Sequence, residues 1–212
     1  MIVSLVLCLA MGYVCGSLPF GLWIGRLARG VDIRTLGSGN LGATNVYRTL
    51  GPGLGILTLL LDIAKGALPV GLVPLSPLGS AFPGGPEWCR LAVALAAVTG
   101  HMWTFLAGFR GGKGAATTVG VLLALAPAAF GVFVVVFFVV VAATRYVSLG
   151  STLGAVAFAV ALGFLAPHGV RSPSFLLGVI LAVLVVVRHR DNFRRLLRGE
   201  ERRFSWRGGG SS

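Results

Sequence analysis

The amino-acid sequence has few charged residues, and acidic residues are the scarcest. Asp, Glu, Lys and Arg make up 11% of the 212 residues, and only 6 side chains are acidic. Hydrophobic residues account for 56%, and the mean hydropathy is +0.90. This composition excludes an ordinary soluble domain. We predict an all-α, polytopic integral membrane protein with a single domain over residues 1–204 and a flexible tail over residues 205–212.

Cysteine is also scarce, which limits redox and metal chemistry. Cys8, Cys15 and Cys89 are an odd number and lack the spacing of a zinc site. Cys8 and Cys15 lie on one face of an apolar segment, as small packing residues do. Asp62 and Asp191 are far apart in the sequence and do not suggest a magnesium cluster. No metal and no cofactor is expected.

The basic residues give a formal net charge of +12, but they do not indicate a nucleic-acid partner. They form clusters that follow apolar segments, at residues 26–48, 110–113 and 188–207. The positive-inside rule places all of these clusters in the cytoplasm. Residues 76–90 carry only Glu87 and Arg90 and are expected to face outward. The N-terminus is then outside and the C-terminus cytoplasmic.

The number of membrane crossings follows from the apolar segments. They cover residues 1–24, 53–75, 91–106, 115–143, 147–165 and 175–187. Because Lys113 and the basic tail are both expected in the cytoplasm, an even number of crossings must separate them. Dividing residues 115–143 at Pro127 satisfies this condition and gives about seven helices, two of them short. Five spans with a re-entrant or interfacial piece are the alternative.

Charged and titratable side chains also occur inside the apolar segments. Asp62 and Lys65 are three residues apart, so on a helix they share a face and can form an ion pair. Such a pair is either structural or part of a cytoplasmic cavity, since charges within a membrane are often functional. His101 is interpreted as a packing or interfacial residue rather than as a catalyst.

The first glycine-rich segment, Leu36 to Arg48, reads LGSGNLGATNVYR. Backbone amides at Gly37, Gly39 and Gly42 can approach an anion closely, and Arg48 adds a permanent positive charge. The G-x-G-x-x-G spacing matches a dinucleotide fingerprint, but the strand that must precede that motif is missing. We therefore predict a phosphate-binding loop.

The second glycine-rich segment, Ala107 to Thr118, reads AGFRGGKGAATT. Gly111, Gly112 and Gly114 leave the backbone open around Lys113, whose ammonium group can bind a phosphate. A helix that begins at residue 115 would add its positive dipole end. A nucleotide P-loop is excluded because Gly114 stands where Ser or Thr is required. The alternative is a positive-inside turn with glycines for tight geometry.

The third segment, residues 188–204, reads RHRDNFRRLLRGEERRF. His189, Asn192 and Arg195 recur every three residues and would share one face of a continuing helix. Basic runs beside a membrane usually contact lipid headgroups, but this does not explain His189 and Asn192.

The strings GSGNLGATNVYR, GFRGGKGAAT and HRDNFRRLLRGEE resemble the three signature motifs of the bacterial acyl-phosphate glycerol-3-phosphate acyltransferases, in the same order. The resemblance covers essentially the whole chain. It implies a seven-helix inner-membrane enzyme that moves a fatty acyl group from acyl-phosphate to the 1-hydroxyl of glycerol 3-phosphate. The products would be lysophosphatidic acid and phosphate, in the first acylation of phospholipid synthesis. Both substrates and membrane lipid would be its partners.

The residues suggest direct attack on the acyl carbonyl, because a Ser-His-Asp triad and the His-x4-Asp motif of other glycerolipid acyltransferases are absent from the sequence. Arg48 and Lys113 would hold the phosphates. His189 would act as general base, or would only bind phosphate while the substrate phosphate takes the proton. Asn192 would orient His189 or a loop. The resemblance adds a substrate contact in a cytoplasmic turn, at Ser148. With it, the other expected substrate contacts are Ser38, Gly39, Asn40, Gly42, Thr44, Asn45, Gly111, Gly112, Gly114, Thr117, Ser148 and Arg195.

A transporter for a phosphorylated metabolite is the strongest rival, because it too needs glycines and basic residues at a cytoplasmic mouth. The polar residues cluster at one expected membrane face, and no inverted repeat is evident in the sequence.

Overall fold

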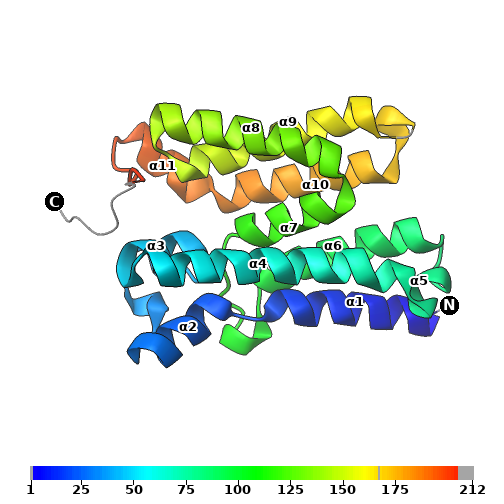
Figure 1. Cartoon of the computed structure of the whole chain (residues 1–212), viewed down its shortest axis with the longest axis horizontal. Helices are drawn as coiled ribbons and strands as arrows, with labels where there is room; N and C mark the ends of the chain where they lie inside the picture. The colour runs from blue at the N-terminus through cyan, green and yellow to red at the C-terminus, as the bar shows by residue number, and fades with distance from the viewer. Residues whose placement is uncertain (1, 167, 205–212) are drawn as a thin grey trace. The chain divides into compact units, whose positions relative to one another are not determined.

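The computed structural model describes residues 2–166 and 168–204, and every regular element in these ranges is a helix (Figure 1). The all-α class predicted from the sequence is confirmed. The chain divides into two compact units, residues 2–124 and residues 125–204, which are described separately. The single domain over residues 1–204 stays a prediction, and the predicted tail at 205–212 lies outside the described residues.

The first unit contains three long helices that run side by side, α1, α4 and α6 (Figure 1). The shorter helices α2 and α3 lie at one end of these three, and α5 lies at the other end beside the N-terminus. Its elements are α1 (Ile2–Ser17), α2 (Phe20–Arg29), η1 (Ile33–Thr35), α3 (Ala43–Leu50), α4 (Pro52–Leu72), η2 (Val73–Leu75), α5 (Pro77–Ser80), α6 (Pro86–Met102), η3 (Phe105–Ala107) and α7 (Ala115–Leu125).

The second unit is built around α9, which packs against both α8 and α10. A cluster of small buried residues, Ala155, Ala159, Ala182 and Val185, lies between α9 and α10. Small side chains allow helices in a membrane to approach closely. The elements are α8 (Pro127–Thr144), α9 (Val147–Leu165), η4 (Gly169–Arg171), α10 (Pro173–Arg188) and α11 (Arg190–Leu197).

Prolines begin several of the long helices. Pro52, Pro86, Pro127 and Pro173 each stand in the first turn, where the missing N–H would have no partner in any case. The division predicted at Pro127 is confirmed, because α7 ends at Leu125 and α8 begins at Pro127.

The first apolar run is interrupted, contrary to the prediction from the sequence. Instead of one segment over residues 1–24, α1 ends at Ser17 and α2 begins at Phe20. Pro19 separates them, because proline donates no hydrogen bond and keeps the preceding residue out of the helical region. The Leu18 carbonyl is therefore available to a side chain.

Glycine allows α1 and α6 to pack closely. A methyl group at Gly16 would collide with the Ala97 carbonyl, so the two backbones touch there. The buried thiols of Cys8 on α1 and Cys89 on α6 lie 3.4 Å apart, sulfur to sulfur, and both cysteines are free. Their position agrees with a packing role.

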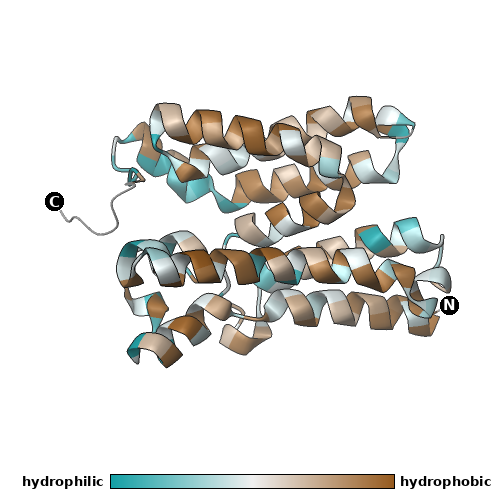
Figure 2. Ribbon diagram, viewed as in Figure 1, coloured by the Kyte–Doolittle hydropathy of each residue, from teal (hydrophilic) through white to brown (hydrophobic). Residues whose placement is uncertain are grey.

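Among the described residues, five helical segments are long and apolar enough to cross a membrane: residues 2–29, 52–75, 86–107, 127–144 and 147–165. A sixth is added if α10 and α11, which meet at 51°, form one broken span. The helix α7 is shorter. Apolar residues dominate the long helices in Figure 2, and large side chains such as Leu60 and Phe164 are exposed, as lipid-facing residues are. The number of crossings and the sidedness stay predictions.

Candidate active site

The first glycine-rich loop joins η1 to α3 and makes tight turns. Gly37 and Gly39 have φ of 59° and 69°, in the left-handed region that glycine adopts readily. The side-chain oxygen of Asn40 accepts a hydrogen bond from the Gly42 N–H at 2.8 Å. Because the Gly39 N–H also donates to the Leu36 carbonyl, at 2.9 Å, both amides are engaged within the loop. This corrects the expectation that they are open to an anion.

Asn45, which is buried on α3, holds this loop in shape. Its Nδ2 donates to the carbonyls of Leu36 and Asn40 at 3.0 Å each and to that of Ile33 at 3.3 Å. Its Oδ1 accepts from the Ser38 N–H at 2.9 Å. Asn45 therefore organises the loop that presents Ser38, and its contact with substrate stays a prediction.

Asp32 anchors the segment that precedes the loop. Its carboxylate accepts from Nη2 of Arg34 at 2.6 Å and from Nη2 of Arg26 at 3.0 Å. The hydrogen bond from the Arg34 side chain, followed by those from its backbone and from Arg26, holds the pKa of Asp32 well below its usual range. Nη1 of Arg34 also reaches the Ala107 carbonyl at 3.5 Å, which links this segment to η3.

The two glycine-rich loops share one hydrophobic cluster. Ala107, at the start of the second loop, packs with Leu41 and Val46 of the first loop and its helix, and with Leu22 and Ile33. The sequence predicted that both loops serve one phosphate-binding pocket, and the structure brings both loops together in the first unit.

The second loop is hydrogen-bonded to the end of α6. The N–H of Gly111 donates to the Met102 carbonyl at 3.2 Å, and that of Gly112 donates to the His101 carbonyl at 3.1 Å. Both amides are therefore engaged by α6, and substrate contacts at Gly111 and Gly112 stay a prediction. Gly114 has φ of 80°, and α7 begins at the next residue. Lys113 lies between these fixed points and is half-buried.

Two of the predicted contact residues lie on helices next to the loops. Thr44 is half-buried in the first turn of α3. Thr117 is buried on α7, where a methyl group at Gly66 of α4 would collide with its carbonyl. Its hydroxyl has no hydrogen-bond partner within the described part of the chain. Thr117 thus faces α4.

The sequence predicted that the third motif continues the preceding helix. In the structure, α10 instead ends and a separate helix, α11, follows. The chain bends by 51° at His189, the residue that follows α10, whose backbone angles φ of −99° and ψ of 6° are not helical. Nδ1 of the buried His189 ring lies 2.8 Å from the Val185 carbonyl oxygen. Since a carbonyl only accepts, this contact places a hydrogen on Nδ1 and leaves Nε2 as the basic nitrogen of a neutral ring.

Glu201 is at the centre of the polar contacts in the second unit. Its Oε1 accepts from Nδ2 of Asn192 at 2.5 Å and from Oγ of Ser148 at 2.9 Å, and its Oε2 accepts from Nε of Arg195 at 2.9 Å. Burial alone would raise the pKa of Glu201, but these three hydrogen bonds outweigh burial and hold it below the usual value. Ser148 lies in the first turn of α9 rather than in a connecting turn.

The role of Glu201 was not predicted from the sequence. The only available signal was an acidic pair in a basic segment, and the pair itself does not distinguish buried Glu201 from exposed Glu200.

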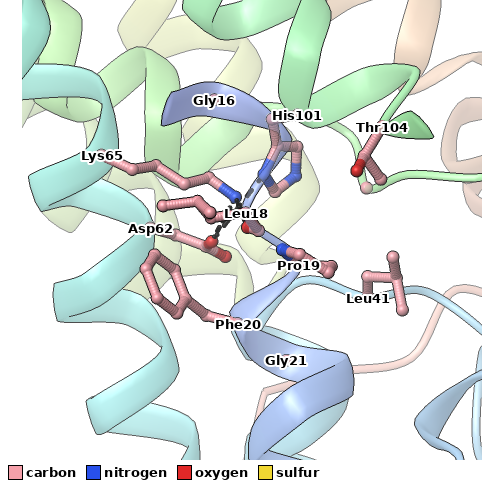
Figure 3. A pocket seen from close by; sticks show the side chains of 11 residues that line it. Gly16, Leu18, Pro19, Phe20, Gly21, Leu41, Asp62, Lys65, His101 and Thr104 are labelled. Atoms are coloured by element: carbon pink, nitrogen blue, oxygen red, sulfur yellow. Dashed lines mark hydrogen bonds and ion pairs between the residues drawn. The ribbon is translucent and has the colours of Figure 1, made fainter. Parts of the chain in front are cut away.

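The ion pair expected between Asp62 and Lys65 is confirmed, with 2.8 Å between Nζ and Oδ1. Both side chains line a small cavity in the first unit with His101, Leu41 of the first loop and Gly112 of the second (Figure 3). Within residues 2–166 and 168–204, no group of three or more His, Cys, Asp or Glu side chains is arranged to hold a metal ion.

Comparisons with known proteins agree with this arrangement. The family model described as glycerol-3-phosphate acyltransferase matches residues 6–199. The chain is 47% identical over 204 residues to the glycerol-3-phosphate acyltransferase of Anaeromyxobacter sp. (strain Fw109-5), covering 95% of this chain and 97% of the relative. It is also 47% identical over 195 residues to that of Geobacter sulfurreducens (strain ATCC 51573 / DSM 12127 / PCA), covering 92% and 95%.

Solved structures give the same result. The glycerol 3-phosphate form of PlsY (YgiH), an integral membrane glycerol 3-phosphate acyltransferase, superposes with a TM-score of 0.84 at 37% identity, covering 95% of this chain and 96% of that chain. Its lysophosphatidic acid form gives 0.82 at 35% identity, with the same coverage. The resemblance predicted from the three motifs is confirmed, and the matching family is one of enzymes rather than of transporters. The chain belongs to the family of integral membrane glycerol-3-phosphate acyltransferases.

Proposed function

We propose that this acyltransferase takes its fatty acyl group from an acyl-phosphate and transfers it to the 1-hydroxyl of glycerol 3-phosphate. The products are lysophosphatidic acid and inorganic phosphate. The proposal rests on the two glycine-rich loops, which pack on one shared hydrophobic cluster. A basic residue follows or interrupts each loop. Because both proposed substrates carry a phosphate, the enzyme needs two phosphate-binding loops. The solved relatives with glycerol 3-phosphate and with lysophosphatidic acid support the acceptor and the product.

Arg48 on α3 and Lys113 in the second loop bind the substrate phosphates. Both side chains are half-buried, and ionic hydrogen bonds are stronger in such surroundings than in bulk water. Asn45 and the carbonyls of α6 fix the two glycine-rich loops next to these residues, so the backbone is ordered before the reaction begins. They stabilise the negative charge that develops on the leaving phosphate. Ser38 and Thr44 supply hydroxyl contacts.

The acceptor oxygen attacks the acyl carbonyl carbon, and the bond from this carbon to the phosphate oxygen breaks. The proton of the attacking hydroxyl passes to Nε2 of His189, while the phosphate leaves with the bonding electrons. The contact between Nδ1 and the Val185 carbonyl supports this role, because it favours the ring form that is basic at Nε2. In the alternative, the substrate phosphate takes the proton and His189 only binds phosphate.

Glu201 holds Ser148 of α9 together with Asn192 and Arg195 of the third motif, and these side chains contact a substrate phosphate. The basic clusters next to all three motifs support an active site on the cytoplasmic face of the inner membrane. The acyl chain lies among the apolar helices, where its hydrocarbon is removed from water.

The experiment compares acyl donors with purified protein in lipid. Glycerol 3-phosphate is supplied with palmitoyl phosphate, palmitoyl-coenzyme A or palmitoylated acyl carrier protein, and the lipid product is identified by mass spectrometry. We expect 1-palmitoyl lysophosphatidic acid with palmitoyl phosphate alone. Equal transfer from either thioester contradicts the proposed donor.

A further inference from the structure

We infer that Asp62, Lys65 and His101 are positioning residues that hold the second glycine-rich loop in place beside the first. The inference rests on the proposed function, in which these loops carry the phosphate-binding side chains.

The three side chains are buried in helices that are candidate membrane spans. Asp62 is 1% exposed, Lys65 5% and His101 5%. Burying charges is costly, and apolar side chains of similar size usually pack as well or better than a buried ion pair. Helix packing alone therefore does not explain why α4 carries Asp62 and Lys65.

Lys65 connects α4 to the break between α1 and α2. Beyond its ion pair, Nζ donates a hydrogen bond to the Leu18 carbonyl at 2.6 Å and lies 5.6 Å from the centre of the Phe20 ring. The start of α2 in turn touches the first loop, because a methyl group at Gly21 would collide with the Leu41 carbonyl. Lys65 thus fixes the surface on which the first loop rests.

Asp62 faces His101, which supports the second loop. Oδ1 of Asp62 lies 3.8 Å from Nδ1 of His101. The His101 carbonyl accepts the Gly112 N–H at 3.1 Å, and a methyl group at Gly112 would collide with Nε2 of the ring. The ring therefore lies directly against the backbone that precedes Lys113.

The cavity between these groups shows that both loops meet at the cluster. Figure 3 shows Asp62, Lys65 and His101 pointing toward one another, with Leu41 on the other side of the cavity. Its volume of about 10 Å³ holds roughly one water molecule. Such a space is too small for a substrate, so the cluster acts on the reaction through the loops.

The test replaces both charges with apolar side chains of similar length, in Asp62→Leu/Lys65→Met. If the pair served packing alone, this variant would fold and keep wild-type constants. We expect it to elute and melt as a folded protein, yet to lose roughly 10- to 100-fold in kcat/KM for glycerol 3-phosphate through a higher KM, because small displacements of positioning groups have effects of this size. Wild-type kcat and KM in the folded double variant overturn the inference.

Hydrogen exchange provides a readout that does not require activity. We expect the amides of Gly111 and Gly112 to lose protection in the double variant and in His101→Gln, because the loop is no longer held against α6. Unchanged protection in both variants overturns the inference. The matched control is Thr58→Val, one turn before Asp62, where the buried hydroxyl bonds to Leu54 of its own helix at 2.8 Å.

The two proposals fail in different ways. Wild-type protein that releases phosphate without needing glycerol 3-phosphate contradicts the proposed reaction, whereas lost protection at Gly111 and Gly112 still supports the positioning role. If the wild-type enzyme is active and the folded double variant keeps both its kcat and KM and its amide protection, only the positioning role is contradicted. The proposed reaction then still stands.

Discussion

Glu201 accepts a hydrogen bond from Ser148, 53 positions earlier in the sequence, at 2.9 Å. This bond joins the segment after α11 to the first turn of α9. Because the same carboxylate binds Asn192 and Arg195, one buried acid fixes Ser148 of α9 together with two polar side chains of the third motif. Ser148 and Arg195 were expected to contact the substrate and Asn192 to orient His189 or a loop, whereas Glu201 was not predicted.

Replacing Glu201 should impair catalysis in a graded manner. Glu201→Gln keeps an oxygen for Ser148 and Asn192 but presents an NH2 group to Arg195, so we expect a loss of about tenfold in kcat/KM, equal to about 1.4 kcal/mol. Glu201→Ala leaves all three donors without this acceptor and should also destabilise the protein by about 1–3 kcal/mol. Steady-state kinetics and thermal unfolding measure both effects. The control is Glu200→Gln, at an exposed neighbour, and wild-type behaviour of Glu201→Ala contradicts the assigned contacts.

The lowered pKa of Glu201 predicts an acid-sensitive stability. A carboxyl whose pKa is lower in the folded state stabilises the protein fully above the unfolded pKa of about 4.3, and this contribution is lost as the pH falls through the folded pKa. The thermal midpoint should therefore fall below about pH 4.3. In Glu201→Gln the thermal midpoint should fall less steeply as the pH is lowered. Asp32, whose pKa is also lowered, accounts for the acid sensitivity that remains. Identical pH dependence in the two proteins is at odds with a native carboxylate at Glu201.

The general-base role of His189 can be separated from phosphate binding. As a base, the neutral imidazole is required, so wild-type kcat/KM should decline at acidic pH as the ring becomes protonated. His189→Ala should lose about 10²- to 10⁴-fold in rate and also lose this acidic decline. A similar loss of rate with an unchanged pH profile assigns the proton to the substrate phosphate instead.

Packing of α1 against α6 predicts a cross-link within the chain. The sulfur atoms of Cys8 and Cys89 are 3.4 Å apart, so a small movement brings them to the bonding distance of about 2.05 Å. Copper phenanthroline should form this disulfide, detected by peptide mapping, with Cys15 left as a free thiol. Cys8→Ser should abolish the link. A disulfide that includes Cys15, or the absence of any disulfide, contradicts the packing of α1 against α6.

Local sequence patterns predicted much of the helical structure. The bounds expected for α9, residues 147–165, are those observed, and Pro127 separates α7 from α8 as expected. The spacing of Asp62 and Lys65 predicted their ion pair. These features depend on residues within a few positions of each other, so helix periodicity and proline chemistry are sufficient to find them.

The remaining features depend on contacts between distant segments. The engaged amides of Gly111 and Gly112 need the carbonyls of α6, and the role of Glu201 needs Ser148 on α9. The contact of His101 with Asp62 joins α6 to α4. Spacing along the chain contains no information about such pairs. The break at Pro19 was readable from local chemistry, but the apolar character of residues 1–24 concealed it.

The most direct test of the acyl-phosphate reaction is phosphate release from palmitoyl phosphate by purified protein in lipid, with and without glycerol 3-phosphate. We expect release that requires glycerol 3-phosphate and falls by roughly 100-fold or more in both Arg48→Ala and Lys113→Ala, because each removes a charge that stabilises the leaving phosphate. Arg29→Ala, at the exposed end of α2, should keep wild-type rates. Release that is independent of glycerol 3-phosphate, or unaffected by either substitution in a folded variant, contradicts the account.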